Sequence, residues 1–226
     1  MSTGAVIVAA GSGERFGKPK QFELVAGLPL FLHSVRTFAS HPEIEEIVLV
    51  VPEQYLQQMK HIVDEHEHSG KIIYAPGGSR RQDSVANGLA ASWFGDDSVI
   101  LVHDGARPLL THDLISRVRE AAMEHSAAIA AIPVVDTIKR ADGNFAATTV
   151  VRSMLWQAQT PQAARKDLLL KALQRAAEEG TTATDEAELL EKIGVQSYIV
   201  MGDDDNFKVT YPRDILLAET LLKMRR

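Results

Sequence analysis

Residues 10–20 combine small and basic side chains in a loop after an apolar run, and such a loop could hold a polyphosphate. The loop carries three glycines and three cations, namely Gly11, Gly13, Gly17, Arg15, Lys18 and Lys20. Glycine lets backbone N–H groups approach phosphate oxygens closely, and the cations offset the charge of the phosphates. We therefore expect a triphosphate cradle here. The competing interpretation is a flexible turn whose basic side chains are solvated.

Two familiar phosphate-binding motifs do not fit this loop. The dinucleotide fingerprint G-x-G-x-x-G needs glycine at position 16, where the sequence has Phe16. The ATPase loop G-x-x-x-x-G-K-[ST] needs glycine at 12 and a hydroxyl at 19, where the sequence has Ser12 and Pro19. Pro19 also disfavours a helix that starts at once. These mismatches argue against an NAD-dependent oxidoreductase.

The distribution of charge points to a small polyanionic ligand. Among 226 residues there are 24 Lys+Arg and 30 Asp+Glu, and the net charge of −6 argues against a nucleic-acid binder. Many cations nevertheless lie in or beside turn-rich segments: Arg15, Lys18, Lys20, Arg80, Arg81, Arg107, Arg152 and Lys208. A basic pocket in an acidic protein suits a small phosphorylated ligand.

Other features of the composition exclude whole classes of protein. The chain has no cysteine, which rules out disulfides, thiolate zinc sites and cysteine nucleophiles. We see neither a signal-peptide pattern nor an apolar run long enough to cross a bilayer. We therefore expect a soluble cytoplasmic enzyme that has no membrane partner.

The elements that must position the basic loop alternate along the chain. Apolar runs rich in β-branched residues predict buried strands at 4–10, 47–51, 71–75, 99–102 and 127–133. Segments of helical length and pattern lie between them at 29–40, 54–66, 83–93 and 113–125. This alternation predicts an α/β fold with a doubly wound, mostly parallel sheet, which holds ligands beyond the carboxyl ends of its strands.

A β-hairpin interrupts this alternation at residues 134–156. Two β-prone stretches, 134–140 and 145–153, flank a turn that contains Asp142 and Gly143. A two-stranded ribbon is marginal in water, so it should pack on something, most simply a second copy of the protein. We expect a homodimer formed through this inserted arm.

The α/β pattern resumes after the arm. It predicts helices at 166–179, at 185–193 and from 212 onward, and strands at 196–201 and 206–210. No repeat or linker divides the chain, so we expect residues 1–226 to form one domain with the arm inserted in it.

The order of several short motifs resembles that of a known family. Besides Pro19-Lys20-Gln21 in the loop, the sequence contains Gly77-Gly78 before Asp83-Ser84-Val85, Val102-His103-Asp104-Gly105-Ala106-Arg107-Pro108, Asp136-Thr137-Ile138-Lys139-Arg140, Thr160-Pro161-Gln162, Thr184-Asp185-Glu186 and Asn206-Phe207-Lys208-Val209-Thr210. Together they resemble the 2-C-methyl-D-erythritol 4-phosphate cytidylyltransferase family of the non-mevalonate isoprenoid pathway. The resemblance implies a Rossmann-like fold and transfer of CMP from CTP to a small polyol phosphate, with Mg²⁺ as cofactor.

The resemblance also implies a group of catalytic cations. A phosphate oxygen of the acceptor would attack the α-phosphorus of CTP, and a phosphate dianion needs no serine, cysteine or general base to do so. Arg15 and Lys20 would stabilise the transition state. Lys208 and Arg152 would position the attacking phosphate. Because Arg152 lies in the arm, and arm residues of the family reach the partner's active site, the resemblance implies a site shared between subunits.

Binding roles follow from the same resemblance. It implies that CTP contacts Ala10, Gly11, Ser12, Gly13, Gly78 and Ser84. It implies that the polyol phosphate contacts Asp104, Arg107, Thr137, Arg152 and Lys208. Asp104 follows a predicted strand, where a carboxylate among phosphates would hold Mg²⁺ or a substrate hydroxyl. Plainer interpretations are an ion pair between Asp104 and Arg107 and an N-cap role for Asp83 or Ser84.

Two further functions compete with this interpretation. Ribitol-5-phosphate cytidylyltransferases have nearly the same loop and chemistry, so ribitol 5-phosphate is the alternative acceptor. A catalytically inactive nucleotide sensor is disfavoured because Arg15, Lys20, Asp104 and Lys208 are all present.

Three other clusters have structural explanations. His61, His66 and His68 lack the spacing of a zinc site and suit a solvated helix end. Residues 184–188 carry a capping pattern and should start a helix. Residues 160–162 should form a structural turn.

Overall fold

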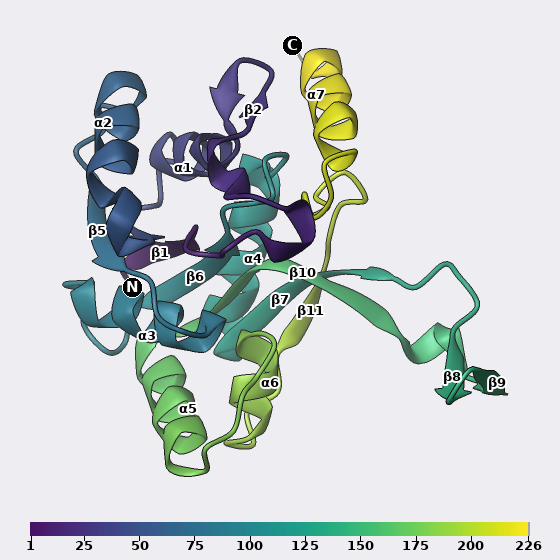
Figure 1. The fold of residues 1–226 in the computed structure, drawn as a ribbon. Helices are drawn as coiled ribbons and strands as arrows, with labels where there is room; N and C mark the ends of the chain where they lie inside the picture. Colours follow the sequence, from purple (N-terminus) through teal and green to yellow (C-terminus); the bar gives the residue numbers. More distant parts are fainter. Residues whose placement is uncertain (226) are drawn as a thin grey trace.

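The computed structural model describes residues 1–225, and its central feature is a seven-stranded sheet in the order β11-β7-β10-β6-β1-β4-β5 (Figure 1). The strands are β1 (Thr3–Val8), β4 (Glu46–Val51), β5 (Ile72–Pro76), β6 (Val99–Asp104), β7 (Ala127–Pro133), β10 (Trp156–Arg165) and β11 (Tyr198–Met201). Neighbouring strands are parallel except where β10 pairs with β6 and β7. The predicted α/β fold with a mostly parallel sheet is confirmed.

Helices cover both faces of this sheet. On one face lie α1 (Leu30–Ala39), α2 (Leu56–His66) and α4 (His112–His125). On the other lie α3 (Arg81–Ala91), α5 (Lys166–Glu178) and α6 (Glu186–Glu191). The last helix, α7 (Asp214–Met224), packs near the short hairpin β2 (Leu24–Val25) and β3 (Leu28–Pro29). Across residues 1–225, no helix combines the length and the apolar character that a membrane crossing requires.

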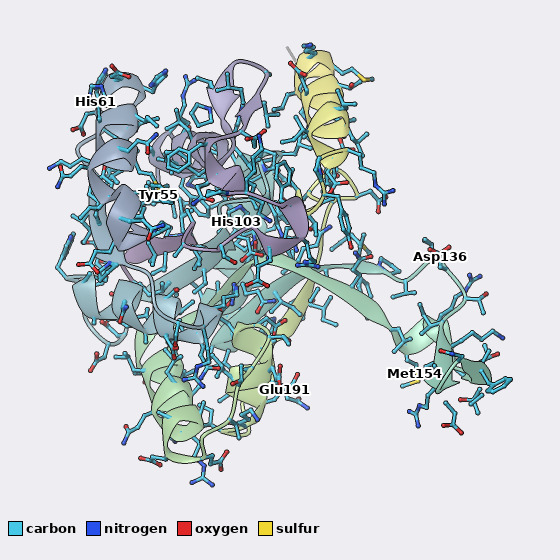
Figure 2. All side chains as sticks on the ribbon, in the orientation of Figure 1. Tyr55, His61, His103, Asp136, Met154 and Glu191 are labelled. Carbon is cyan, nitrogen blue, oxygen red and sulfur yellow. The ribbon has the colours of Figure 1, made fainter. Side chains whose placement is uncertain are left out.

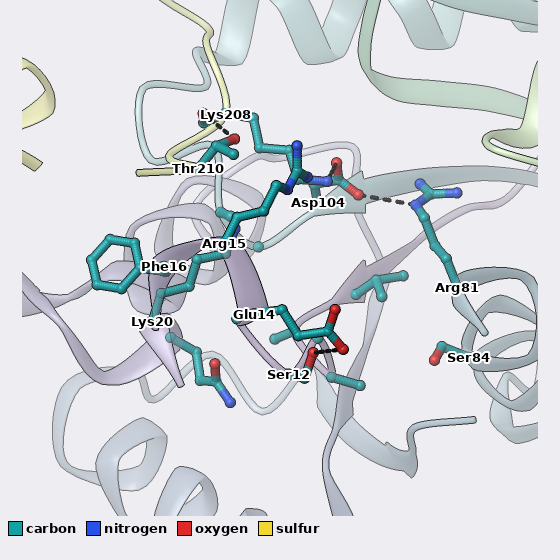
Figure 3. Close-up of a pocket in the computed structure, with 18 of the residues that line it drawn as sticks. Ser12, Glu14, Arg15, Phe16, Lys20, Arg81, Ser84, Asp104, Lys208 and Thr210 are labelled. Atoms are coloured by element: carbon teal, nitrogen blue, oxygen red, sulfur yellow. Dashed lines mark hydrogen bonds and ion pairs between the residues drawn. The ribbon is translucent and has the colours of Figure 1, made fainter. Parts of the chain in front are cut away.

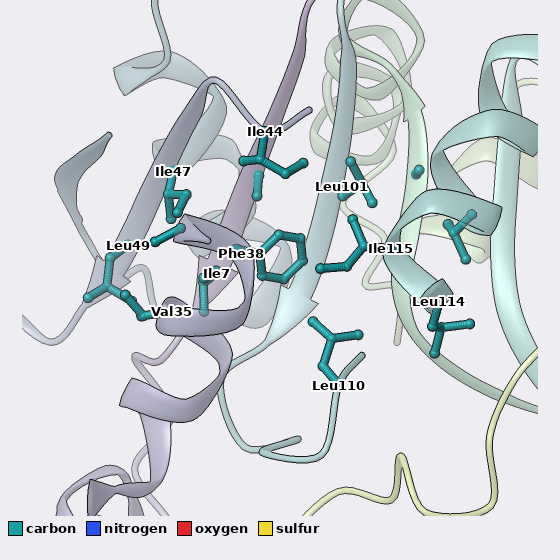
Figure 4. Close-up of a cluster of buried hydrophobic side chains, with 14 of the residues drawn as sticks. Ile7, Val35, Phe38, Ile44, Ile47, Leu49, Leu101, Leu110, Leu114 and Ile115 are labelled. Carbon is teal, nitrogen blue, oxygen red and sulfur yellow. The ribbon is translucent and has the colours of Figure 1, made fainter. Parts of the chain in front are cut away.

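The side chains of β1 show why residues 5–8 of this strand are all apolar. Ala5 and Ile7 point into the cluster under α1, α2 and α4, whereas Val6 joins the cluster under α3 and α5. Figure 4 shows the first cluster, in which Phe38 of α1 and Ile115 of α4 lie near the strands. Burying a large apolar side chain contributes roughly 1.5–3 kcal/mol, so both faces of the sheet stabilise the fold. A strand buried on both faces needs no polar alternation.

The path of the chain around β1 leaves a crevice at the carboxyl ends of the central strands. β1 lies between β4 and β6 and is parallel to both. The chain leaves β1 for β4 through α1 on one face and reaches β6 through α3 on the other face. The loops after β1 and β6 therefore diverge at the carboxyl ends of the two strands. Ligands bind at such a switch point in doubly wound sheets.

The structure corrects two predictions of local structure. Residues 160–162, expected as a turn, lie inside β10, where the register with β7 shifts. This strand was missed because buried polar residues such as Gln159 and Gln162 interrupt its apolar pattern. Residues 206–210, expected as a strand, form none and instead pack as an irregular segment, where Val209 N donates to Ala106 O at 2.9 Å.

The chain between β7 and β10 forms the predicted arm. β8 (Lys139–Asp142) and β9 (Phe145–Thr149) pair antiparallel around Gly143, whose φ of +56° suits glycine, and the short 3-10 helix η4 (Arg152–Met154) follows. The arm projects from the sheet, and Figure 2 places Asp136 and Met154 on this projection. Phe145 is 80% exposed and Met154 is 82% exposed. Within one chain the arm thus leaves large apolar side chains in solvent.

Candidate active site

A pocket of about 660 Å³ lies at the carboxyl ends of β1 and β6 (Figure 3). Its walls come from the loop after β1, the start of α3, the end of β6 and the irregular segment of residues 206–210. The predicted site residues that line it are Ala10, Gly11, Ser12, Gly13, Arg15, Lys20, Gly78, Ser84, Asp104 and Lys208. The fold thus gathers residues from distant parts of the sequence at the switch point.

The loop after β1 has a fixed shape. Gly13 has a φ of +75°, and a Cβ atom on it would lie 2.1 Å from Lys18 O, so only glycine fits. Gly13 O accepts from the backbone N–H groups of Phe16 and Gly17 at 2.8 and 2.9 Å. The Phe16 side chain is buried beside α7. Phe16, which breaks the dinucleotide fingerprint, therefore anchors the loop in the core.

Lys20 carries a positive charge into a partly buried position. Its ammonium donates to Val209 O at 2.7 Å, which connects the loop after β1 to the irregular segment of residues 206–210. Burial, and then the nearby charge of Lys208, lower the pKa of Lys20 to about 8. Cations held this close together repel one another and favour an anion between them. The pocket is electrostatically suited to a phosphate.

Asp104 at the end of β6 is held by two cations. Its Oδ2 accepts from Lys208 Nζ at 2.7 Å, and its Oδ1 accepts from Arg81 Nε at 3.1 Å. Burial acts to raise the pKa of the Asp104 carboxyl, but Arg81, Lys208 and Arg107 outweigh it and hold this pKa well below its ordinary range. Asp104 is therefore ionised, and its carboxylate fixes where the Lys208 ammonium lies.

Thr160 of the neighbouring strand β10 holds the backbone of Asp104. Its N–H donates to Thr160 Oγ1 at 3.1 Å, and Thr160 Oγ1 lies 3.0 Å from Nδ1 of the fully buried His103. His103 Nε2 faces Arg107 O at 3.4 Å, and a carbonyl can only accept, so Nε2 carries the proton and Nδ1 accepts from Thr160. Burial lowers the pKa of His103 to about 3, so the ring is neutral and structural.

The start of α3 faces the pocket through Gly78 and Ser84. The backbone N–H of Gly78 donates to Ser84 Oγ at 3.0 Å, and a Cβ atom on Gly78 would lie 2.4 Å from Asp83 Cβ. The N-cap residue is Arg80 and not Asp83 or Ser84 as expected. Asp83 lies three residues later, where its carboxylate accepts from Arg80 N at 3.0 Å. The Arg80 side chain, through hydrogen bonds, lowers the pKa of Asp83 to about 2.

Comparison with known proteins identifies the family. The family model described as 2-C-methyl-D-erythritol 4-phosphate cytidylyltransferase matches residues 3–224. The chain belongs to this family. A protein of that name from Bacillus velezensis is 42% identical over 96% of this chain and 94% of its own length. A bifunctional enzyme IspD/IspF from Desulfotalea psychrophila is 46% identical, and this chain spans 58% of its length.

Solved structures agree with the family assignment. The 4-diphosphocytidyl-2C-methyl-D-erythritol synthase of Anaerococcus prevotii superposes with a TM-score of 0.86 at 29% identity, covering 98% of this chain and 96% of that one. The 2-C-methyl-D-erythritol 4-phosphate cytidylyltransferase of Thermus thermophilus gives 0.81 at 32% identity, covering 99% of this chain and 100% of that one. The cytidylyltransferase fold thus extends over nearly the whole chain.

Three residues expected in the cytidylyltransferase site lie outside the pocket. Arg107 is packed behind it, where Nη1 donates to Asn206 O at 2.7 Å and the buried Nε has no hydrogen-bond partner. Thr137 and Arg152 lie on the arm, and Arg152 Nη1 donates to Val135 O. The ion pair considered between Asp104 and Arg107 is absent from the described residues, because Arg81 and Lys208 hold the carboxylate instead.

The sequence indicated Arg81 only as one of several turn-region cations and Glu186 only as part of a helix start, and it did not predict their ion pair. Arg81 Nη1 and Nη2 donate to the Glu186 carboxylate at 2.5 and 3.0 Å, while its Nε holds Asp104. Glu186 is the first residue of α6, and the expected helix start there is confirmed, since Asp185 accepts from Glu188 N at 2.9 Å. An acidic residue in a first helical turn is common, so helix capping alone was taken to explain the motif Thr184-Asp185-Glu186.

The side chains around Asp104 bear on whether it could hold Mg²⁺. Within residues 1–225, no group of three or more His, Asp or Glu side chains could hold a metal ion. Both carboxylate oxygens of Asp104 already accept from cations, and these positive charges would repel Mg²⁺. Asp104 as a metal ligand remains a prediction from the sequence, and its ion pairs weigh against it.

Proposed function

We propose that this chain transfers CMP from CTP to 2-C-methyl-D-erythritol 4-phosphate, giving 4-diphosphocytidyl-2-C-methyl-D-erythritol and pyrophosphate. The observation that carries the proposal is the meeting of Arg15, Lys20 and Lys208 with a glycine-containing loop in one pocket. Two polyanionic substrates repel each other, so a site that brings them together needs cations and firm positioning. The membership of the chain in the cytidylyltransferase family supports CTP as the donor.

The chemical step needs no proton transfer to the protein. An oxygen of the acceptor phosphate forms a bond to the α-phosphorus of CTP, and the bond from that phosphorus to the bridging oxygen of pyrophosphate breaks. The phosphate dianion supplies the attacking electron pair, and pyrophosphate leaves with the pair of the broken bond. Negative charge grows on the α-phosphate and the leaving group. Arg15 and Lys20 stabilise this charge, one as a fork that grips two oxygens and one as a point charge.

The remaining pocket residues bind and orient the substrates. The backbone of the loop at Ala10, Gly11, Ser12 and Gly13 holds the triphosphate. Gly78 and Ser84 at the start of α3 face the cytosine. Asp104 contacts a substrate hydroxyl and Lys208 the acceptor phosphate. The support for this division is their common position around one pocket.

The reaction is proposed to use Mg²⁺. Mg²⁺ keeps several waters and binds readily to phosphate oxygens, so a nucleoside triphosphate can carry it without a protein cage. The ion would be held by the triphosphate, since the carboxylate of Asp104 is already engaged by Lys208 and Arg81.

We further propose that the protein is a homodimer whose arms complete each other's sites. Two observations support this: the arm exposes Phe145 and Met154 to solvent, and it carries Thr137 and Arg152 outside the pocket of its own chain. A second copy would cover the apolar surface and receive these two side chains. The expected cytoplasmic location also remains a prediction.

The test incubates the purified protein with CTP and Mg²⁺ and with one acceptor at a time, and measures pyrophosphate release. We expect turnover with 2-C-methyl-D-erythritol 4-phosphate and little with ribitol 5-phosphate. UTP in place of CTP serves as the control for base selection.

Three results would contradict parts of the proposal. Turnover with ribitol 5-phosphate alone would overturn the acceptor. Equal rates with UTP would overturn the role of Gly78 and Ser84. CTP binding without turnover on any acceptor would identify a nucleotide sensor.

A further inference from the structure

Four side chains of alternating charge connect the pocket to the buried face of α6. The order is Lys208, Asp104, Arg81 and Glu186, with contacts of 2.7 Å, 3.1 Å and 2.5 Å between successive members. They come from the irregular segment after β11, the end of β6, the start of α3 and the start of α6. Of these four residues, only Lys208 is needed for direct contact with a phosphate.

Three of the five N–H donors of the Arg81 guanidinium are used by carboxylates. Nε donates to Asp104, and Nη1 and Nη2 donate to the two oxygens of Glu186. Arg81 lines the pocket, yet each of its three nitrogens already donates to a carboxylate. Its position suits the orientation of Asp104 better than direct binding of CTP.

Glu186 is fixed before any ligand arrives. It is buried, and the next residue, Ala187, donates its N–H to Gln162 Oε1 of β10 at 3.0 Å. Gln162 also donates to the N-cap residue Asp185 at 3.0 Å. The first turn of α6 is therefore attached to the central sheet, and it presents the Glu186 carboxylate to Arg81 at a defined place.

The energetics favour a positioning role over a stabilising one. A buried ion pair is weak evidence for stability, because the cost of desolvating two charges can exceed their attraction. Apolar side chains of similar volume would fill the space of Arg81 and Glu186 without the cost of desolvating two charges. Without Glu186, however, Arg81 would be a cation satisfied only by Asp104, and it would compete with Lys208 for that carboxylate. Glu186 thus determines how firmly Asp104 holds Lys208.

We infer that Glu186 and Arg81 are positioning residues of the transfer site, acting through Asp104 to aim the Lys208 ammonium at the acceptor phosphate. The inference rests on the proposed function. Glu186 removes the excess charge of Arg81, Arg81 holds one oxygen of Asp104, and the other oxygen orients Lys208.

The test is a double-mutant cycle between Glu186→Gln and Lys208→Ala. We expect Glu186→Gln to lower kcat about tenfold while the Kd for CTP changes less than about twofold. In the Lys208→Ala background the same substitution should change kcat less than about twofold, because the residue it acts through is gone. Equal losses of kcat in both backgrounds would overturn the inference, since a purely structural defect does not depend on Lys208.

Glu188→Gln is the matched control on the same helix. The Glu188 carboxylate accepts from Thr184 N at 2.7 Å and Thr184 Oγ1 at 2.9 Å, and it contacts neither Arg81 nor the pocket. We expect it to retain the wild-type kcat. If Glu186→Gln does not fold, Arg81→Lys replaces it in the cycle, since lysine keeps the charge but cannot hold both carboxylates. The same expected and contradicting results apply.

A structural readout separates this inference from the proposed function. Crystal structures of wild type and Glu186→Gln give the distance between Lys208 Nζ and Asp104 Oδ2 whether or not the protein turns over a polyol phosphate. We expect contact in the wild type and displacement of Lys208 in the variant. An unchanged contact in the variant would overturn the inference, whereas an inactive wild type with the expected displacement would overturn only the proposed function.

Discussion

The pocket and the arm are held in place by different surroundings. The pocket lies at the end of the central sheet, and its side chains Asp104, Lys208 and Arg81 are oriented by contacts within the chain. The arm, by contrast, pairs only with itself between β8 and β9 and leaves Phe145 exposed. The pocket forms within one chain, but Thr137 and Arg152 do not line it. The arm has these residues but packs on no other element of the described chain, and this difference is the basis of the proposed site shared between two copies.

The comparison predicts a large difference in stability between the two regions. Phe38 is fully buried between α1 and the sheet, so Phe38→Ala should lower the free energy of unfolding by about 3–5 kcal/mol. Phe145→Ala should change it by less than about 0.5 kcal/mol, because its side chain is solvated within the chain. Urea denaturation at protein concentrations low enough to keep the chains separate measures both. Similar losses would mean that the arm packs on its own core.

Removing the pocket's central cation should have the next largest effect. Lys20→Ala should lower kcat by on the order of 10² or more, because it removes a charge placed to meet the transition state. Lys18→Ala is the control, since Lys18 lies outside the pocket and its side chain is 60% exposed in an ion pair with Glu23. Steady-state pyrophosphate release compares the two. A near-normal rate for Lys20→Ala would remove Lys20 from the catalytic group.

The pH dependence tests the electrostatics of the pocket. Burial and Lys208 lower the pKa of Lys20 to about 8, so its proton is lost above that pH. If the ammonium is required, kcat/KM for CTP should be level between about pH 7, where the substrate phosphates are fully ionised, and about pH 8, and fall about tenfold per pH unit above it. Lys20→Arg should extend the level region upward, because a guanidinium keeps its proton. The same decline in both proteins would assign it to another group.

The sequence predicted the parts of the molecule that depend on local patterns. Buried strands such as β1 and β4 have apolar runs, the arm has its Asp-Gly turn, and the helix start at Asp185 has its capping residues. β10 was missed because its sequence lacks apolar alternation. Polar side chains such as Gln162 are buried in it, where they form hydrogen bonds.

The site was predictable only as a set of residues. The position of Lys208 depends on Asp104, about a hundred residues away in sequence, and on an Arg81 to Glu186 contact that bridges 105 residues. Arg81 appeared among turn-region cations and Glu186 in a capping motif, and neither position indicated the other as its partner. Motif order could gather Arg15, Lys20, Asp104 and Lys208, but only the folded sheet places the first turn of α6 beside them.

Mixing of two inactive variants tests the division between pocket and arm most directly. Lys20→Ala disables the pocket of its own chain, and Arg152→Ala disables the arm that would reach the partner. Random exchange of equal amounts makes half of the dimers mixed, each with one intact site, so roughly a quarter of all sites should be restored. Pyrophosphate release should then rise to about a quarter of the wild-type rate. No gain in activity after verified subunit exchange would contradict a site shared between the pocket of one copy and the arm of another.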